Sequence, residues 1–252
     1  MLKRNKQRKA SLDAAFRAEA KPATEMKSVT LVPVGHVFPA TSTHFGGMPY
    51  FTAGDSWPCL EEDGRPYDFI CQINLNDCPV RPDVPFDLFL VFLCWALVES
   101  EDVDFELACI VRTYRDVSNS KAIQIPRPST ISEDDYRVQP CTVHLDKCMT
   151  YPSWSMKEYP AIASAAAEFR NPRSAIDRSL KRLGFLHDFR SRIGGYPTWV
   201  HDNTLEGEDS IILAQIDYHH EARNCIGDSA PIYISVSSTE PLGIETDVFQ
   251  TF

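Results

Sequence analysis

Histidines beside carboxylates are the residues of this chain that could do acid–base or metal chemistry. They occur in four places: His144-x-Asp146, His187-Asp188, His201-Asp202 and His219-His220-Glu221. Histidine titrates near neutral pH and ligates metals, so each group could serve as a general base or as part of a metal site. None has the His-Glu-x-x-His spacing, and adjacent strand residues such as His219 and His220 point to opposite faces. We therefore expect surface histidines, and we predict no catalytic residue, no metal site and no cofactor.

Paired glycines occur twice, as Gly46-Gly47 and Gly194-Gly195, and could form phosphate-binding loops. They lack the Gly-x-Gly-x-x-Gly and Gly-x-x-x-x-Gly-Lys-Ser/Thr patterns, and each is followed by a proline, Pro49 or Pro197, that removes an N–H donor. A Gly-x-Ser-x-Gly nucleophile motif does not occur either. We interpret both Gly-Gly-x-Pro segments as structural turns, because adjacent glycines permit positive φ and close approach of another segment.

Polar side chains interrupt two apolar runs at matching positions. These residues are Gln72 with Asn74 in residues 69–75, and Gln215 with Asp217 in residues 212–218. A buried amide must be hydrogen-bonded, so one interpretation is that each glutamine ties its Gly-Gly-x-Pro turn to the sheet. The alternative is that the pairs line a groove that captures a peptide or protein segment. Trp57 and Trp199 would then be the apolar anchors of that groove.

The densest acidic segment spans residues 99–106 and includes Glu99, Glu101 and Asp102. One interpretation is a solvated hairpin tip between two strands. The other is a contact surface for a basic protein partner, which opposite charge would attract and orient.

Gln72 and Gln215 each lie within a longer series of segments, and this series occurs twice in the chain. An apolar-Gly-Gly-x-Pro-x-aromatic segment starts at Phe45 or Ile193, and a short apolar run ending in Gln-Ile-Asn/Asp follows it. A further apolar run begins 17 residues after each glutamine, at Phe89 or Ile232. Two copies of this segment, each followed by the same two apolar runs, predict internal duplication. The second copy is short, so we expect it to complete a shared sheet rather than to fold alone.

Hydrophobic periodicity predicts the elements that hold these segments. The continuously apolar run 89–95 indicates a central strand buried on both faces. Strands are also expected over residues 29–34, 69–75, 107–114 and 138–145, and helices over 162–169 and 173–190. The second helix has apolar residues every three or four positions, which is typical of one buried face.

The charge is unevenly distributed along the chain. The 252 residues carry a formal net charge of −10, but residues 1–27 hold eight basic and three acidic residues, a net +5, which leaves about −15 on the rest. This acidity argues against a nucleic-acid binder and is compatible with a basic protein partner. Residues 1–22 are predicted to be a basic N-terminal helix or arm, either solvated or in contact with a partner.

The same chain has no apolar stretch typical of a secretory signal or a membrane span. Its eight cysteines form no Cys-x-x-Cys pair, and several lie inside apolar runs, which indicates free, packed thiols. We expect a cytoplasmic protein that does not bind membranes.

Several motifs together resemble the YwqG-like family. They are Phe45-Gly-Gly-Met-Pro49, Trp57-Pro58, Asp63-Gly64-x-Pro66, Phe69-Ile-x-Gln72-Ile73-Asn74-Leu75, Gly194-Gly195-Tyr-Pro197 and Leu213-x-Gln215-Ile216-Asp217. The resemblance covers most of residues 28–252 and implies an α+β domain built by duplication, with mixed or antiparallel strands forming a pseudo-barrel and a few peripheral helices. The family is distantly related to programmed-cell-death-2-like proteins. Their cysteine-rich zinc finger is absent here, so their ribosomal role is not carried over.

The resemblance implies no catalytic residue, and bacterial YwqG-like proteins are associated with toxin–immunity loci. We therefore expect a non-catalytic, immunity-type or antitoxin-like protein that binds a protein partner, for example a basic toxin. A chaperone or peptide-binding module and an unrecognised hydrolase or metal enzyme are the alternatives. The expected division is the arm 1–22 and one domain 23–252, with repeat one at about 23–150, a helical link at about 160–190 and repeat two at about 191–252.

Overall fold

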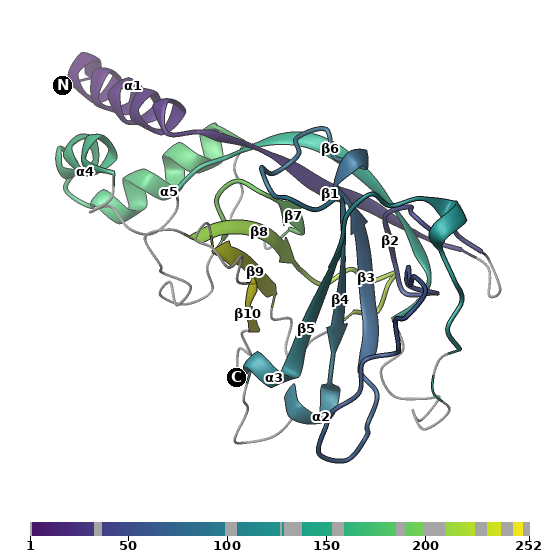
Figure 1. Cartoon of the computed structure of the whole chain (residues 1–252). Coiled ribbons are helices and arrows are strands. Elements are labelled where there is room, and N and C mark those ends of the chain that lie inside the picture. Colours follow the sequence, from purple (N-terminus) through teal and green to yellow (C-terminus); the bar gives the residue numbers. More distant parts are fainter. Residues whose placement is uncertain are drawn as a thin grey trace.

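A computed structural model of the chain shows one curled β-sheet with its three longest helices grouped beyond one end of it (Figure 1). The structure describes residues 2–32, 37–98, 105–126, 128, 138–152, 159–184, 190–198, 210–224, 231–237 and 244–248. The strands are β1 (Lys21–Leu31), β2 (His44–Phe45), β3 (Asp68–Asn74), β4 (Leu88–Leu93), β5 (Cys109–Tyr114), β6 (Cys141–Thr150), β7 (Arg192–Ile193), β8 (Ser210–Ile216), β9 (Ile232–Ser237) and β10 (Ile244–Val248). The helices are α1 (Leu2–Ala18), α2 (Trp95–Val98), α3 (Phe105–Ala108), α4 (Pro160–Ala167) and α5 (Pro172–Arg182), with 3-10 turns η1 (Leu75–Asp77) and η2 (Asn119–Lys121).

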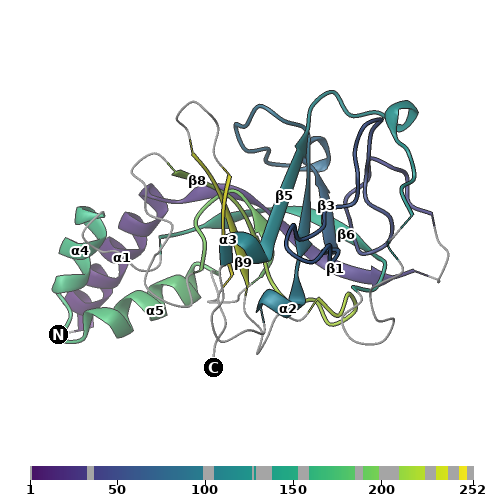
Figure 2. The ribbon, with the colours of Figure 1, turned by 60° about the horizontal axis from the view of Figure 1, so that its bottom comes forward.

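The ten strands form a single antiparallel sheet in the order β10-β9-β8-β7-β1-β6-β2-β3-β4-β5. The sheet curls into a half-barrel, and its edge strands β5 and β10 approach each other (Figures 1 and 2). This confirms the α+β class and the antiparallel pairing.

The centre of the sheet is the long pair β1 and β6, which runs from Lys21↔Thr150 to Leu31↔Cys141. On its other side β1 pairs with β7, whereas β6 pairs with β2. Strand β1, which precedes β2–β5 in sequence, therefore lies beside β7. Strand β6, which precedes β7–β10 in sequence, lies beside β2. We refer to β1 with β7–β10 and to β6 with β2–β5 as the two half-sheets, and the expected repeat boundary at about residue 150 stays a prediction.

The two half-sheets share local geometry at the Gly-Gly turns. Both glycine pairs have positive φ, 55° and 76° at Gly46 and Gly47 and 70° and 75° at Gly194 and Gly195. The N–H of Gly46 donates to Ile70 O, and that of Gly194 to Leu213 O, each at 2.9 Å. The strand that accepts the bond is bulged at that residue in both halves. This geometry requires glycine, because left-handed backbone is costly for other residues.

Strand β4 separates two hydrophobic clusters, which confirms that it is a central strand buried on both faces. Phe89, Val91 and Leu93 point into the central core between the half-sheets. The alternate residues, Leu88, Leu90 and Phe92, pack under the loops that cover the outer face. Period-2 alternation explains this division, because successive strand side chains point to opposite faces.

Helices α1, α4 and α5 pack together through a hydrophobic cluster of their own. Leu12 and Phe16, one turn apart on α1, are fully buried in it. The N-terminal segment thus forms helix α1, which is docked on α4 and α5, and β1 begins at Lys21. In the described part of the chain, no helix is both long and apolar enough to cross a bilayer.

Some predicted element boundaries are wrong. The helix expected over 173–190 ends at Arg182, and Gly184, with φ of +79°, has the left-handed conformation that terminates helices. The strand expected over 29–34 extends much further toward the N-terminus, since β1 gains partners on both sides. The strand expected over 107–114 begins at Cys109, after the single turn α3.

Candidate functional site

Gln72 lies on β3 with its amide fully engaged by the backbone of the first Gly-Gly turn. Its Oε1 accepts from Tyr50 N at 2.7 Å, and its Nε2 donates to Ala40 O and Ser42 O, each at 2.8 Å. The side chain is 0% exposed. These three bonds join the segments before and after the turn to the sheet.

Gln215 repeats this arrangement on β8. Its Oε1 accepts from Thr198 N at 2.8 Å, its Nε2 donates to Arg190 O at 3.3 Å, and the side chain is 0% exposed. The geometry matches the interpretation that each glutamine ties its turn to the sheet. A partner could not contact either glutamine in this structure without first displacing the turn that covers it.

The polar residues two positions later, Asn74 and Asp217, have different surroundings. Asn74 is buried, donates from Nδ2 to Thr41 O at 2.7 Å and accepts at Oδ1 from Asn76 N at 3.0 Å. Asp217 Oδ1 accepts from Tyr218 N at 2.7 Å. Burial raises the pKa of Asp217 to about 6, against the lowering effect of that N–H and of Arg192. The two halves therefore differ in charge at this position.

The other predicted partner-binding residues are internal or lie outside the described part of the chain. Trp57 is only 7% exposed, and its Nε1 donates to Tyr67 O at 2.7 Å inside the outer-face cluster. It therefore anchors its own loop. Trp199, Glu99, Glu101 and Asp102 fall outside the described residues, as do His187 and His201.

The predicted structural glycines do meet neighbouring segments closely. A Cβ on Gly46 would overlap the carbonyl oxygen of Val138, just before β6. A Cβ on Gly195 would overlap Thr150 Oγ1 and stand 2.8 Å from Ala23 Cβ, whereas one on Gly194 would meet only Pro82 Cγ at 3.7 Å. One glycine in each turn thus lets the turn lie against the β1–β6 pair.

A serine–histidine pair that sequence reasoning missed lies beside the second turn. Ser191 Oγ is 2.8 Å from His219 Nε2 and accepts from Asp217 N at 2.7 Å. Asn224 Oδ1 accepts from His219 N at 2.7 Å, which holds the histidine loop in place. No motif marks Ser191, because the pairing joins residues 28 apart in sequence.

The distance between Ser191 and His219 is that of a nucleophile and its base, but their surroundings are not those of an active site. Ser191 is 0% exposed. Burial lowers the pKa of His219 to about 4, well below the value near 7 that suits a general base at neutral pH. His219 also packs on the Phe45 ring, with centroids 4.8 Å apart, so the pair links the second half-sheet to β2. In this structure the Ser191–His219 contact therefore packs two parts of the fold together.

The remaining described candidate, His144-x-Asp146, is a contact between two surface side chains. His144 Nε2 lies 3.1 Å from Asp146 Oδ1, with the two side chains 67% and 41% exposed. Among the residues that the structure describes, no three His, Cys, Asp or Glu side chains converge as a metal site requires.

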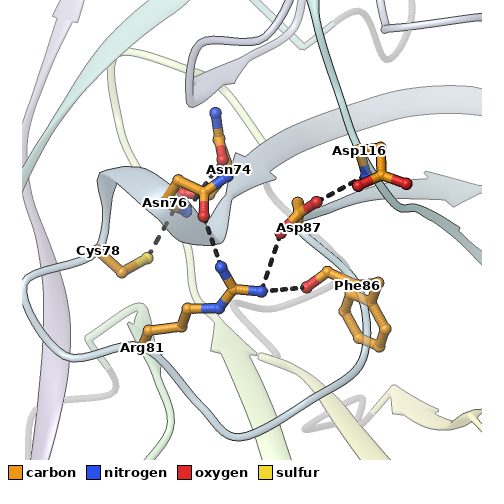
Figure 3. A network of polar contacts seen from close by, with 7 residues as sticks. All are labelled: Asn74, Asn76, Cys78, Arg81, Phe86, Asp87 and Asp116. Carbon is orange, nitrogen blue, oxygen red and sulfur yellow. Dashed lines mark hydrogen bonds and ion pairs between the residues drawn. The ribbon is translucent and has the colours of Figure 1, made fainter.

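Arg81 lies beside an acidic rim, which we define as Asp77 at the end of η1, Asp83 and Asp87 on the loop that follows it, and Asp116 on the loop after β5. Figure 3 shows its guanidinium reaching Asn76 Oδ1 at 2.5 Å, Phe86 O at 3.0 Å and Asp87 Oδ1 at 3.0 Å. Asp87 Oδ2 in turn accepts from Asp116 N at 2.7 Å, so two loops are held together (Figure 3). Asp77, Asp83 and Asp116 are exposed. The rim is therefore a charged surface on a hydrogen-bonded frame.

Comparison with known proteins places most of the chain in one family. The sequence matches the family described as a domain of unknown function (DUF1963) over residues 43–240. The match runs from just before β2 to just after β9, so α1, β1 and β10 lie outside it. No curated protein matches the sequence.

Proposed function

The chain belongs to the family described as a domain of unknown function (DUF1963), and from this premise we propose that it is a non-catalytic binding protein of the YwqG-like type. Its partner would be a basic protein, held in the manner of an immunity protein that neutralises a toxin. The YwqG-like motifs of the sequence analysis support the type, and the charge of the sheet supports the class of partner.

The observation that carries the proposal is the segregation of charge. Helices α1, α4 and α5, with residues 168–171 and 183–184 that adjoin them, hold eleven basic and three acidic residues, a net +8. The formal charge of −10 for the whole chain therefore leaves about −18 on the rest, of which the residues that the structure describes hold eleven basic and seventeen acidic residues, a net −6. A surface of this charge steers a basic partner toward it and orients the encounter.

The binding surface would lie where the two halves differ, since the shared residues Gln72 and Gln215 are internal. The acidic rim is such a place, because Arg81 and Asp87 frame it, whereas the loop after β8 is framed by His219 and Asn224. The similar turns, bulges and glutamine bonds of the two halves support an origin by duplication, with exchange of the first strands. Seven described cysteines are free thiols, which supports a reducing compartment such as the cytoplasm.

The test uses the products of neighbouring genes as candidate partners. Each is expressed with and without the protein, and neutralisation of a toxic, basic product is measured as restored growth and as direct binding. The rim variant Asp77→Asn/Asp83→Asn should weaken binding about tenfold, whereas the control Glu61→Gln/Glu62→Gln, which removes the same charge from another exposed loop, should not. Equal loss in both variants, or no basic product that binds, would refute the proposal.

The Ser191–His219 pair allows a direct test of the proposal that the protein is not a catalyst. The proposal predicts that a fluorophosphonate probe does not label Ser191, which is buried. Labelling that disappears in Ser191→Ala but persists in the exposed-site control Ser120→Ala would show a reactive serine and favour the hydrolase alternative.

A further inference from the structure

Eleven of the 25 basic residues of the chain belong to one helical layer, defined as α1, α4 and α5 with residues 168–171 and 183–184. Its net charge of +8 comes from two segments, 2–18 and 160–184, that are far apart in sequence. The hydrophobic cluster of Leu12, Phe16, Ile176 and Leu180 holds them together. The fold thus builds a strongly basic element into a chain that is acidic overall.

Ion pairs fix how the helices of the layer lie. Asp13 Oδ1 on α1 lies 2.6 Å from Arg182 Nη2 on α5. Arg8 Nε, also on α1, lies 3.0 Å from Glu168 Oε2, just after α4. Helix α1 is therefore tied to both α4 and α5. Asp13 and Glu168 are thus paired within the layer, whereas Lys6, Lys9, Arg17, Arg178 and Lys181 have exposed side chains.

The outward-facing positions carry cations on both α1 and α5. The exposed basic residues are Lys6, Lys9 and Arg17 on α1, and Arg173, Arg178, Lys181 and Arg182 on α5. Arg17 is close enough to Asp13 to lower the pKa of that carboxyl, and Arg182 bonds to the same residue, so cations of both helices meet at this seam. The exposed large apolar residues of the described chain all lie off this layer, at Leu31, Val37, Met48, Leu107, Ile123, Met149, Ile211 and Tyr218.

We propose that the helical layer binds the phosphate backbone of a nucleic acid without reading its sequence. Lysine and arginine on exposed helices are the usual phosphate contacts. A protein partner would call for apolar or aromatic anchors, and an interfacial membrane helix for an apolar face. The described surface of the layer offers neither, so phosphate charge is the complement that fits it.

The position of the helical layer explains how a polyanion could bind to a chain with a net charge of −10. The helices lie beyond one end of the sheet in both views (Figures 1 and 2). At physiological salt, charges more than about 8 Å apart in water are largely screened. A nucleic acid lying along α1 and α5 would feel the nearby cations strongly and the acidic sheet weakly.

This geometry predicts weak binding with a steep dependence on salt. If about half of the seven exposed cations contact phosphates, the slope of log K against log salt is about −3 for duplex DNA. A threefold rise in salt then lowers the affinity roughly 30-fold, from a dissociation constant of about 10⁻⁴ to 10⁻⁶ M that is usual for non-specific binding.

The experiment measures fluorescence anisotropy of a labelled duplex DNA of arbitrary sequence with the full chain at several salt concentrations. The test variant is Lys9→Gln/Arg178→Gln, and its matched control is Lys147→Gln/Arg115→Gln, which removes the same charge from exposed positions on the sheet and its loops. Glutamine keeps helix propensity, and thermal melting by circular dichroism verifies that both variants fold. The test variant should lose about fivefold or more in affinity and flatten the salt slope, and the control should match the wild type.

Three results would overturn the proposal. One is no salt-dependent binding to duplex DNA or to a single-stranded RNA of arbitrary sequence. Another is an equal loss of affinity in both variants, which would place the contact elsewhere. The third is salt-sensitive self-association or binding to anionic phospholipid vesicles that Lys9→Gln/Arg178→Gln abolishes while DNA binding is unchanged.

Discussion

Replacing Gln72 by glutamate would test whether this residue is a structural tie or a partner contact. The variant Gln72→Glu keeps an oxygen for Tyr50 N but places a second oxygen against Ala40 O and Ser42 O, which now lie 2.8 Å from Nε2. Two hydrogen bonds are lost, and two part-buried carbonyls then face an oxygen instead of a donor. At about 1–3 kcal/mol for each carbonyl left unsatisfied, the cost is about 2–6 kcal/mol. That is a large fraction of the total stability of a typical protein, about 5–15 kcal/mol.

The loss should also depend on pH in a defined direction. Burial among carbonyls raises the pKa of the introduced carboxyl above its unfolded value of about 4.3. Its destabilising effect is therefore greatest above the raised pKa and shrinks as the pH falls through it, because the protonated acid regains a donor. Urea unfolding at pH 7 and pH 5, followed by circular dichroism, measures the deficit relative to the wild type at each pH.

The control is Gln124→Glu, which makes the same chemical change at an exposed position and should alter stability by less than about 0.5 kcal/mol. Gln215→Glu should be destabilising but milder, since its donor contact to Arg190 O is longer, at 3.3 Å. A Gln72→Glu protein as stable as Gln124→Glu at pH 7 would refute the structural reasoning. It would return Gln72 to the candidates for a partner contact.

Three further predictions concern the turns, the buried histidines and the helical layer. Gly195→Ala should destabilise by about 1–3 kcal/mol more than Gly194→Ala in thermal unfolding, since both have left-handed backbone but only the former meets Thr150 and Ala23; equal effects would contradict the close approach. Burial lowers the pKa of His44 and of His219 to about 4, so each is neutral when folded, and each should cost about 2 kcal/mol of stability at pH 5 as the unfolded chain takes up protons below about 6.5. Asp217, whose pKa burial raises to about 6, opposes this by about 1 kcal/mol, so a lower urea midpoint at pH 5 than at pH 7 is expected and a higher one would refute the assignment. Phe16→Ala should cost about 3–5 kcal/mol and speed hydrogen exchange in α1 while β3 and β4 stay protected; uniform exchange would show that the layer and sheet unfold together.

The sequence by itself determined the features that depend on neighbouring residues. The continuous apolar run of β4 specifies a strand buried on both faces, and its two faces do pack into two clusters. The paired glycines before Pro49 and Pro197 specify left-handed turns, since few other residues adopt that backbone. The glutamine that follows each turn marks a buried amide that needs partners, although the identity of those partners, such as Ala40 O for Gln72, was not visible.

Only the tertiary structure decided what joins distant parts of the chain. The placement of β1 beside β7 and of β6 beside β2 depends on pairing across about 100 residues or more, and no local pattern encodes which strand a segment will meet. The approach of Ser191 to His219 likewise follows from the β7–β8 pairing. Charge shows the difference most clearly, because a net value of −10 averages over a chain whose fold collects +8 on three packed helices and leaves about −18 elsewhere.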